Sequence, residues 1–222
     1  MDHHDRDHAH DGHAPIQDGA EETYYEKRTW AIQTLLMEKG IIAANEIRRQ
    51  IESVDSRTPA DGAKVIARAW VDPEFKERLL RDAKAAVAEL GFDSGEAPVL
   101  VAVENTPKVH NVVVCTLCSC YPRALLGLPP DWYKSLNYRS RVVVDPRGVL
   151  KEFGLELEPG VEVRVYDSSA DIRYLVIPER PAGTEHLSDE ALADLVTRDS
   201  MIGVTKARAP EPQPDRKAAA PA

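Results

Sequence analysis

Apolar residues recur at helical spacing over the first third of the chain. One repeat contains Trp30, Leu35 and Leu36, and Gly40 follows it as a candidate C-terminal cap. A later repeat begins at Asp72-Pro73-Glu74, where an N-cap residue precedes a proline at the first helical position. The pattern predicts a helix that ends near Gly40 and further helices over residues 43–54, 62–70 and 73–91.

The pattern changes to short apolar runs at Pro98. Residues 99–103 and 109–114 are rich in valine, and Asn105-Thr106-Pro107 separates them, which is typical of strand, turn and strand. Residues 161–165 alternate between valine and charged residues, as in a half-buried strand, and residues 172–177 form a further apolar run. Shorter helices are predicted near residues 132–136, 147–153 and 189–195.

These elements predict an α+β fold, in which a helical N-terminal arm and helices precede a layered α/β domain. We expect four segments: a disordered tail rich in His and Asp over residues 1–20, a helical region over 21–92, the α/β domain over 93–208 and a flexible tail over 209–222. Five of the seven histidines lie in the first tail. This composition is typical of a solvated tail and also of a segment that gathers metal ions.

Charge and hydropathy exclude two classes of partner. A net charge of −9 and a pI of 5.3 argue against nucleic acid, whose binding requires clustered Lys and Arg. No apolar run approaches the roughly 20 residues that cross a bilayer. The polar first residues lack the apolar segment of a secretory signal, so we expect a cytoplasmic protein. Clustered cysteines in that compartment indicate a metal site or catalysis more often than a disulfide.

All three cysteines, Cys115, Cys118 and Cys120, fall within six consecutive positions, directly after an apolar run. Soft sulfur ligands on one tight loop favour a transition metal over calcium or magnesium. Two thiolates in Cys118-Ser119-Cys120 also lie on either side of two peptide nitrogens, which a strongly Lewis-acidic trivalent ion can bind as well. Such a set of five protein ligands would leave one position open for a substrate or water.

Other interpretations of the three cysteines remain open at this point. A disulfide would leave one cysteine unpaired, and Cys118 and Cys120 are too close in sequence for an easy bridge. A structural zinc site normally has four ligands, so His110, His186 or a partner would have to complete it. His110 is more readily interpreted as a core or interface histidine. Buried, inert cysteines are a further alternative.

The sequence around the cysteines resembles a known family, the α subunit of nitrile hydratase. The likeness rests on Cys115-Thr116-Leu117-Cys118-Ser119-Cys120-Tyr121-Pro122 and Leu126-Gly127-Leu128-Pro129-Pro130-Asp131-Trp132-Tyr133-Lys134-Ser135. It extends over most of the chain, with further motifs at Trp70-Val71-Asp72-Pro73-Glu74, Glu104-Asn105-Thr106-Pro107, Asp167-Ser168-Ser169 and Thr197-Arg198-Asp199-Ser200-Met201-Ile202-Gly203-Val204.

The resemblance implies a non-corrin metal held by the sulfurs of Cys115, Cys118 and Cys120 and by the backbone nitrogens of Ser119 and Cys120. In the family, the residues that match Cys118 and Cys120 are oxidised to sulfinic and sulfenic acid, which are steps on the cysteine oxidation ladder. Thr116 stands where iron-containing members have Ser, so the expected ion is trivalent cobalt rather than iron, one per αβ unit. Cys118, Ser119 and Cys120 are the expected catalytic residues.

The reaction implied by the resemblance is hydration of a small nitrile to an amide. The metal would polarise the nitrile or activate water, and the oxygen on Cys120 is a candidate nucleophile or base. The implied partners are a β subunit, whose arginines contact the oxidised cysteines, and an activator protein that inserts the metal. We expect an αβ heterodimer that doubles to a heterotetramer.

One position departs from the family pattern. Many nitrile hydratases have Trp where this chain has Arg123, and an arginine there resembles the γ subunit of thiocyanate hydrolase, a sister enzyme with an anionic substrate. We therefore place Arg123 in the substrate pocket, with a structural ion pair as the other interpretation. Thiocyanate hydrolysis is the alternative function. A non-enzymatic metal-binding or assembly protein is a third hypothesis, because the His-rich tail could gather metal for the loop.

Overall fold

The computed structural model describes residues 23–95 and 97–210. The chain divides into two compact units, Met1–Ile51 and Glu52–Ala222, and each is described by itself. The tail predicted over residues 1–20 lies outside the described residues, and so do residues 211–222 of the tail predicted at the other end. The metal-gathering hypothesis for the first tail is therefore not addressed by the structure.

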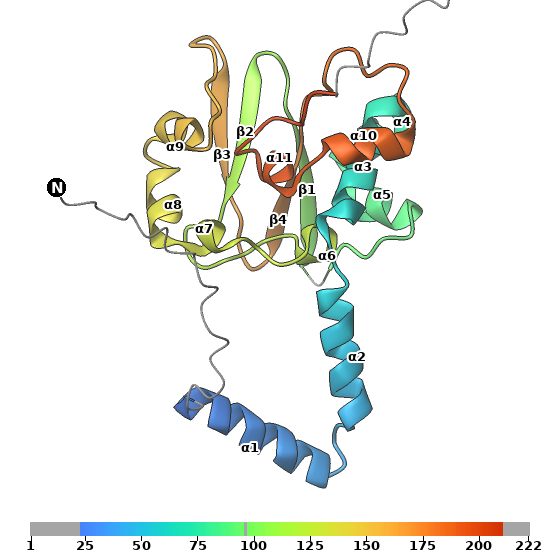
Figure 1. Ribbon diagram of the computed structural model, residues 1–222, viewed down its shortest axis with the longest axis vertical. Coiled ribbons are helices and arrows are strands. Elements are labelled where there is room, and N and C mark those ends of the chain that lie inside the picture. Colours follow the sequence, from blue (N-terminus) through green and yellow to red (C-terminus); the bar gives the residue numbers. More distant parts are fainter. Residues whose placement is uncertain (1–22, 96, 211–222) are drawn as a thin grey trace, which may run out of the picture. The chain divides into compact units, whose positions relative to one another are not determined.

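The first unit contains α1 (Tyr24–Glu38) and most of α2 (Ala44–Asp55) (Figure 1). A capping box begins α1: the Thr23 hydroxyl accepts the Glu26 N–H at 3.3 Å, and the Glu26 carboxylate accepts the Thr23 N–H at 2.6 Å. The predicted stop at Gly40 is confirmed, because Gly40 follows the helix with a φ of +67°.

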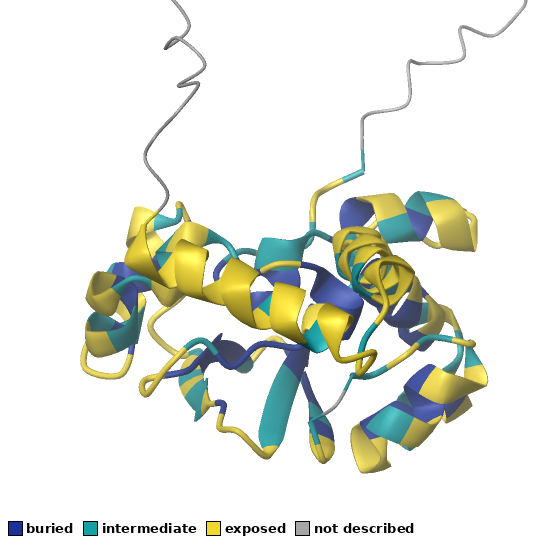
Figure 2. Ribbon diagram, turned by 90° about the horizontal axis from the view of Figure 1, so that it is seen from below, coloured by how far each residue is buried: buried dark blue, intermediate teal, exposed yellow. Residues whose placement is uncertain are grey.

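Helix α1 is exposed along most of its length, and only Gln33 and Leu36 are partly buried. None of its residues is buried, and exposed residues, drawn in yellow, dominate it in Figure 2. Its apolar side chains are no exception, since Trp30 is 56% exposed and Leu35 is 50% exposed. The first unit therefore presents apolar surface that its own residues leave uncovered.

The second unit begins with three consecutive helices, α3 (Pro59–Val71), α4 (Pro73–Arg81) and α5 (Ala83–Glu89). The single helix predicted over residues 73–91 is wrong, because Asp82 leaves the helical conformation and caps α5 through the Ala85 N–H at 3.1 Å. A carboxylate at this position competes with helix continuation by binding a free N–H of the next helix. The periodicity of the apolar residues runs through this break and does not reveal it.

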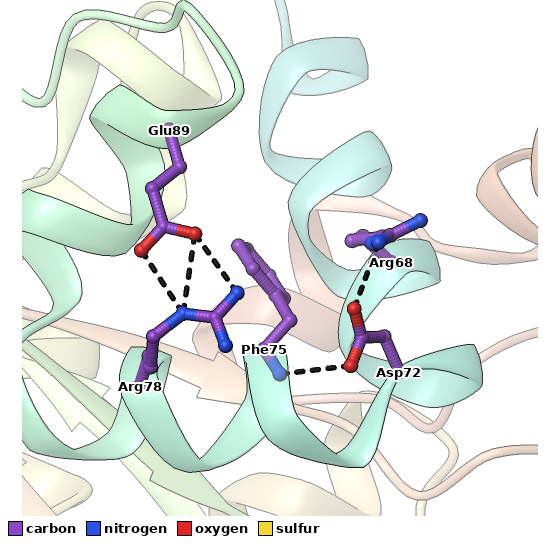
Figure 3. Close-up of polar contacts among 5 residues, drawn as sticks. All are labelled: Arg68, Asp72, Phe75, Arg78 and Glu89. Carbon is purple, nitrogen blue, oxygen red and sulfur yellow. Dashed lines mark hydrogen bonds and ion pairs between the residues drawn. The ribbon is translucent and has the colours of Figure 1, made fainter.

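Asp72 forms the predicted start of α4. Its carboxylate accepts the Phe75 N–H at 3.0 Å and pairs with Arg68 of α3 at 2.8 Å (Figure 3). The backbone contact with Phe75 is the main reason that the pKa of Asp72 is lowered, and Arg68 adds to it. Arg78 of α4 reaches Glu89 of α5 at 2.9 Å, which ties the two short helices together.

Four parallel strands follow, paired in an unexpected way. β1 (Val99–Glu104) pairs with β4 (Ile172–Ile177), and β2 (Val109–Val114) pairs with β3 (Glu162–Asp167). Both strands on either side of the predicted turn are thus confirmed, but among the described residues they do not pair with each other in a sheet, and the isolated bridge between Thr106 and Val109 only closes the turn. In parallel pairs the carboxyl ends of the strands meet at the same edge.

Six short helices complete the unit: α6 (Arg123–Leu126), α7 (Asp131–Lys134), α8 (Leu136–Arg141), α9 (Pro146–Glu152), α10 (Asp189–Leu195) and α11 (Arg198–Ile202). The one helix predicted near residues 132–136 is replaced by α7 and α8, because the Ser135 hydroxyl caps α8 through the Tyr138 N–H at 3.1 Å. α6 and α11 were not predicted, since four or five residues are too few to show a helical period.

Helices cover the strands from two sides. α4 and α5 contact β1, and α9 contacts β3, beside which it lies in Figure 1. Between them is one hydrophobic core that includes Ile66, Phe75 and Leu125. Tyr138 is buried in this core and donates its hydroxyl to the Val113 carbonyl of β2 at 2.8 Å. The α+β class predicted from the sequence is confirmed.

Among the described residues, no helix combines the length and apolar character needed to cross a membrane.

His110 of β2 is a buried core histidine, as expected. Its Nδ1 lies 3.2 Å from the Asn105 side-chain nitrogen and its Nε2 lies 2.7 Å from the Gly203 carbonyl. Because the Asn105 amide donates, Nδ1 is the acceptor and Nε2 carries the proton. Burial lowers the pKa of His110, which favours this neutral form. The interpretation of His110 as a fourth metal ligand is therefore not supported, since both ring nitrogens are used.

Gly203 permits a close approach between the end of α11 and β2. A Cβ atom at this position would lie 1.9 Å from the Asn111 carbonyl oxygen, and its φ is +91°. Gly183 has a comparable φ of +77°, but a Cβ atom there would meet nothing within 4 Å. The two glycines thus share the same backbone requirement and differ in the space around them.

We predict that Gly203→Ala destabilises the chain far more than Gly183→Ala. The backbone strain common to both variants costs about 1–3 kcal/mol. Gly203→Ala must in addition push α11 away from β2, so we expect at least roughly twice that loss. Urea unfolding of the two purified variants and of the parent chain measures the difference. Equal losses of unfolding free energy would show that the contact with Asn111 is unimportant.

Candidate metal centre

Two parallel strands bring the elements of the site to one edge. In the register of β2 and β3, Val114 lies opposite Asp167. The cysteine loop follows Val114 directly, and Ser168 follows Asp167 and donates its N–H to the Val114 carbonyl at 2.7 Å. The chain therefore places the loop of residues 115–120 next to the segment that leaves β3.

The loop gathers the three cysteine sulfurs. Cys118 Sγ lies 3.3 Å from Cys115 Sγ and 3.2 Å from Cys120 Sγ, and all three atoms lie within 4.8 Å of one another. The Cys118 N–H donates to Cys115 Sγ at 3.2 Å, which closes the turn. All three cysteines are free. In the described part of the chain, this is the one group of three His, Cys, Asp or Glu side chains with the spacing of metal ligands.

The three sulfurs differ in exposure and in acidity. Cys115 and Cys120 are buried, whereas Cys118 is exposed. Contacts with the sulfurs of Cys120 and Cys115, and with the backbone N–H groups of Ser119 and Cys120, lower the pKa of Cys118 to about 7. Burial, and then the contact with Cys118, raises the pKa of Cys120 to about 12, although Arg173 acts against the rise. The group thus contains one readily formed thiolate, which is the form that binds a metal.

Asp167 and Arg139 hold the backbone of the loop. The Asp167 carboxylate accepts the Thr116 N–H at 2.9 Å and the Thr116 hydroxyl at 2.5 Å. Arg139 of α8 donates to the carbonyls of Cys115 at 3.1 Å and Thr116 at 2.8 Å. The Asp167 carboxylate thus accepts hydrogen bonds from the donors of the loop, and the Arg139 guanidinium donates hydrogen bonds to its carbonyls.

The sequence alone does not reveal that these two residues contact the loop. Asp167 stands out there only as part of a family motif. Its position, opposite the residue before the first cysteine, becomes visible only when the pairing of β2 with β3 is known. Arg139 lies 23 positions after Thr116, and only the structure shows that it contacts the loop.

Tyr133 of α7 lies beneath the other end of the loop. Its side chain is fully buried, and its hydroxyl donates to the Cys120 carbonyl at 2.8 Å. Burial raises the pKa of Tyr133 well above its ordinary value, so that the hydroxyl stays protonated. In the sequence Tyr133 stands out only as part of a family motif, and nothing there indicates that it contacts the loop.

The remaining predicted site residues lie in or just after the loop. Ser119 is half-buried between two of the cysteines. Arg123 is exposed at the first position of α6, and its side chain forms no hydrogen bond or ion pair with any described residue. The structural ion pair considered for Arg123 is thus not found among the described residues. His186, the second histidine considered as a ligand, is exposed and lies outside the sulfur group.

Comparison with known proteins gives concordant results. The family model described as nitrile hydratase, alpha chain, matches residues 23–205. The chain is 56% identical over 191 residues to the high-molecular weight cobalt-containing nitrile hydratase subunit alpha of Rhodococcus rhodochrous, with 85% of this chain and 94% of that protein covered. It is 42% identical over 185 residues to the thiocyanate hydrolase subunit gamma of Thiobacillus thioparus, with 78% and 76% covered.

A solved structure leads to the same conclusion. A double mutant of the Fe-type nitrile hydratase from Comamonas testosteroni Ni1 superposes with a TM-score of 0.78 at 42% identity, with 88% of this chain and 98% of that chain covered. The similarity thus spans sequence and fold, and it includes the segment that carries the three sulfurs. The chain belongs to the nitrile hydratase alpha-chain family.

Proposed function

We propose that this chain is the α subunit of a cobalt-dependent nitrile hydratase, which adds water to the C≡N bond of a nitrile and releases an amide. The observation that carries the proposal is the group of three free cysteine sulfurs within 4.8 Å of one another. It occurs in a chain that is 56% identical to a cobalt-containing nitrile hydratase α subunit.

The residues present fit such an ion. Thiolate sulfur selects transition metals, and the short loop allows Cys115, Cys118 and Cys120 to approach one centre. The backbone N–H groups of Ser119 and Cys120 face the Cys118 sulfur, where they help to lower its pKa. These two amide nitrogens are therefore available as the further ligands that we propose. The closely related cobalt-containing proteins favour cobalt, although an iron-type relative has the same fold.

Oxidation of two cysteines belongs to the proposal. We assign sulfinic acid to Cys118 and sulfenic acid to Cys120, with dioxygen or a peroxide as the oxidant. Cys118 is exposed and has the lowered pKa, so it is the sulfur most open to oxidation. Cys120 is buried, which protects an otherwise short-lived sulfenic acid from further reaction.

The ion, when bound, supplies a Lewis acid that polarises the nitrile or a water molecule. The chain supplies the rest of the site. The oxygen on oxidised Cys120 is the candidate nucleophile or base toward the nitrile carbon, and Ser119 contributes its amide. We place the exposed side chain of Arg123 at the substrate pocket, because it lies three residues after Cys120 and has no partner among the described residues.

The chain requires a β subunit to cover its exposed apolar residues. Leu117, within the loop, is 86% exposed; Leu136, the first residue of α8, and Val144, which follows that helix, are 76% and 82% exposed. α8 also carries Arg139, whose guanidinium contacts the loop, so we infer that the surface covered by the β subunit includes the loop and α8. Their burial by the β subunit would also exclude water from the site.

Several finer features of the assembly are part of the proposal. We expect two αβ pairs to form a heterotetramer, and an activator protein to insert the cobalt. We also propose a cytoplasmic location, where a reducing environment keeps three neighbouring thiols from forming disulfides. The domain boundaries predicted at residues 21–92 and 93–208 are retained as a proposal.

We predict an oxidised cysteine loop in cobalt-loaded, assembled protein. Tryptic cleavage yields residues 109–123 as one peptide, which holds all three cysteines. We expect its mass to rise by two oxygen atoms localised to Cys118, with a third on Cys120 that handling can remove. Mass spectrometry without reductant measures this gain, and protein produced without cobalt is the control. Three unmodified thiols in the loaded complex would contradict the catalytic proposal and favour a metal-transfer protein.

We predict that the complex with the β subunit hydrates neutral nitriles and that Cys120→Ser lowers kcat by about a hundredfold or more, because a reacting group is lost. Amide release measured by chromatography tests both points, with cobalt content determined in each sample. Thiocyanate is assayed in parallel. Turnover of thiocyanate alone would replace the proposed function by the alternative one.

We predict that Arg123→Gln selectively weakens binding of nitriles that carry a carboxylate. Loss of a charge-assisted hydrogen bond should raise KM for such a substrate about tenfold, while KM for an uncharged nitrile of similar size stays within roughly twofold. Arg81→Gln, at an exposed arginine of α4, is the matched control. An equal change in KM for both substrates would remove Arg123 from the substrate pocket.

A further inference from the structure

Tyr133 and Ser168 are two buried hydroxyl groups close to the metal loop. Tyr133 is 0% exposed and Ser168 is 3% exposed. They come from different elements, α7 and the segment after β3, and each is fixed by a bond to backbone on either side of the loop. Tyr133 donates to the Cys120 carbonyl at 2.8 Å, and the Ser168 N–H donates to the Val114 carbonyl at 2.7 Å.

The Ser168 hydroxyl has no hydrogen-bond partner in the described part of the chain, although it is inaccessible to solvent. A buried hydroxyl without a hydrogen-bond partner costs folding free energy, so a conformation in which the Ser168 hydroxyl donates a hydrogen bond is favoured. The phenol oxygen of Tyr133 is a suitable acceptor for this hydroxyl. Its one proton is donated to the Cys120 carbonyl, and the oxygen can still accept a hydrogen bond. Ser168 also acts against the rise in the pKa of Tyr133 that burial causes.

The surroundings of the phenol point to the same role. Besides Ser168, the groups that act on Tyr133 are Cys115, Cys120 and Asp167, all of which can carry negative charge. A neutral donor in this position stabilises the loop without adding a charge beneath it. Because the Cys120 carbonyl belongs to the peptide that follows the sulfur-bearing residue, its direction helps to set the backbone of Cys120 and hence where Cys120 Sγ points.

We propose that Tyr133 is a positioning residue of the metal centre, and that the Ser168 hydroxyl, which has no partner among the described residues, turns to donate to the Tyr133 oxygen and orients it. Two consecutive hydrogen bonds would thus join Ser168 to Tyr133 and Tyr133 to the Cys120 carbonyl. It holds Cys120 in the place where its sulfur faces Cys118 at 3.2 Å. This inference rests on the proposed function, since the positioned atom is a proposed metal ligand.

Tyr138 provides a matched control for Tyr133. Both tyrosines are buried in the same group of aromatic rings, and both donate a hydroxyl to a backbone carbonyl at 2.8 Å. Tyr138, however, contacts Val113 within β2, before the loop begins. The substitutions Tyr133→Phe and Tyr138→Phe thus remove the same group from comparable surroundings and differ in whether the loop loses its contact.

The test uses the cobalt-loaded complex with its β subunit. We expect both Phe variants to lower the thermal midpoint similarly, because each loses one buried hydrogen bond. Tyr133→Phe alone should shift the sulfur-to-cobalt charge-transfer absorption, speed loss of cobalt to a chelator about tenfold, and lower kcat about tenfold with KM within roughly twofold. Ser168→Ala should change the same quantities in the same direction by a smaller factor. An unchanged spectrum in Tyr133→Phe, or the same shift in Tyr138→Phe, would overturn the proposal.

A second measurement on the metal-free full chain separates this inference from the proposed function. Iodoacetamide is applied at fixed pH, and alkylation is located by mass spectrometry in the peptide of residues 109–123. Tyr133→Phe should speed alkylation of buried Cys120 about tenfold, because the residue is no longer held, whereas Tyr138→Phe should leave it unchanged. This outcome would support the positioning of Cys120 by Tyr133 even if the complex failed to hydrate nitriles. Equal rates at Cys120 in all three chains would refute positioning even if the complex were active.

Discussion

The structure of the candidate site depends on the parallel pairing of β2 with β3. The register places Val114 opposite Asp167, so the cysteine loop and the carboxylate that holds it leave the strands at one edge. A slip of one residue would move Asp167 by ~3.3 Å and turn its side chain to the other face of the sheet. Thr116 would then lose both of its bonds to Asp167. Strand pairing thus sets the position of the loop, and the hydrogen bonds from Arg139 and Tyr133 further fix its backbone.

The charges around the loop agree with the metal and the partner subunit proposed for this site. Three sulfurs within 4.8 Å can each carry a negative charge, and the burial of Cys120 opposes its ionisation. Arg139 directs its guanidinium to loop carbonyls, and Arg173 is the cation that acts on Cys120. A multivalent cation is a physically adequate counter-charge for such a group. A partner subunit that brings further cations and covers Leu117 would serve the same end.

Much of this site was accessible from the sequence, and the reasons are local. The spacing of Cys115, Cys118 and Cys120 implied that the sulfurs meet, because six residues cannot separate them far. The strands were visible as apolar runs, and the Asp72 cap was visible as a motif. Strand pairing was not visible, because the turn after β1 suggests neighbours whereas the true partners lie some 50 to 70 residues later. For the same reason the roles of Asp167, Tyr133 and Ser168 could not be derived from spacing.

The double contact between Thr116 and Asp167 bears on how a family of this kind distinguishes one metal from another. Asp167 accepts the backbone N–H and the side-chain hydroxyl of Thr116. The resemblance described above implies serine at this position in iron-containing members of the family. Serine carries both of these donors, so an exchange of the two residues would preserve the two hydrogen bonds to Asp167. What serine lacks is a single methyl group. Any metal preference encoded at this position must therefore come from the volume and stiffness of that methyl group and not from hydrogen bonding.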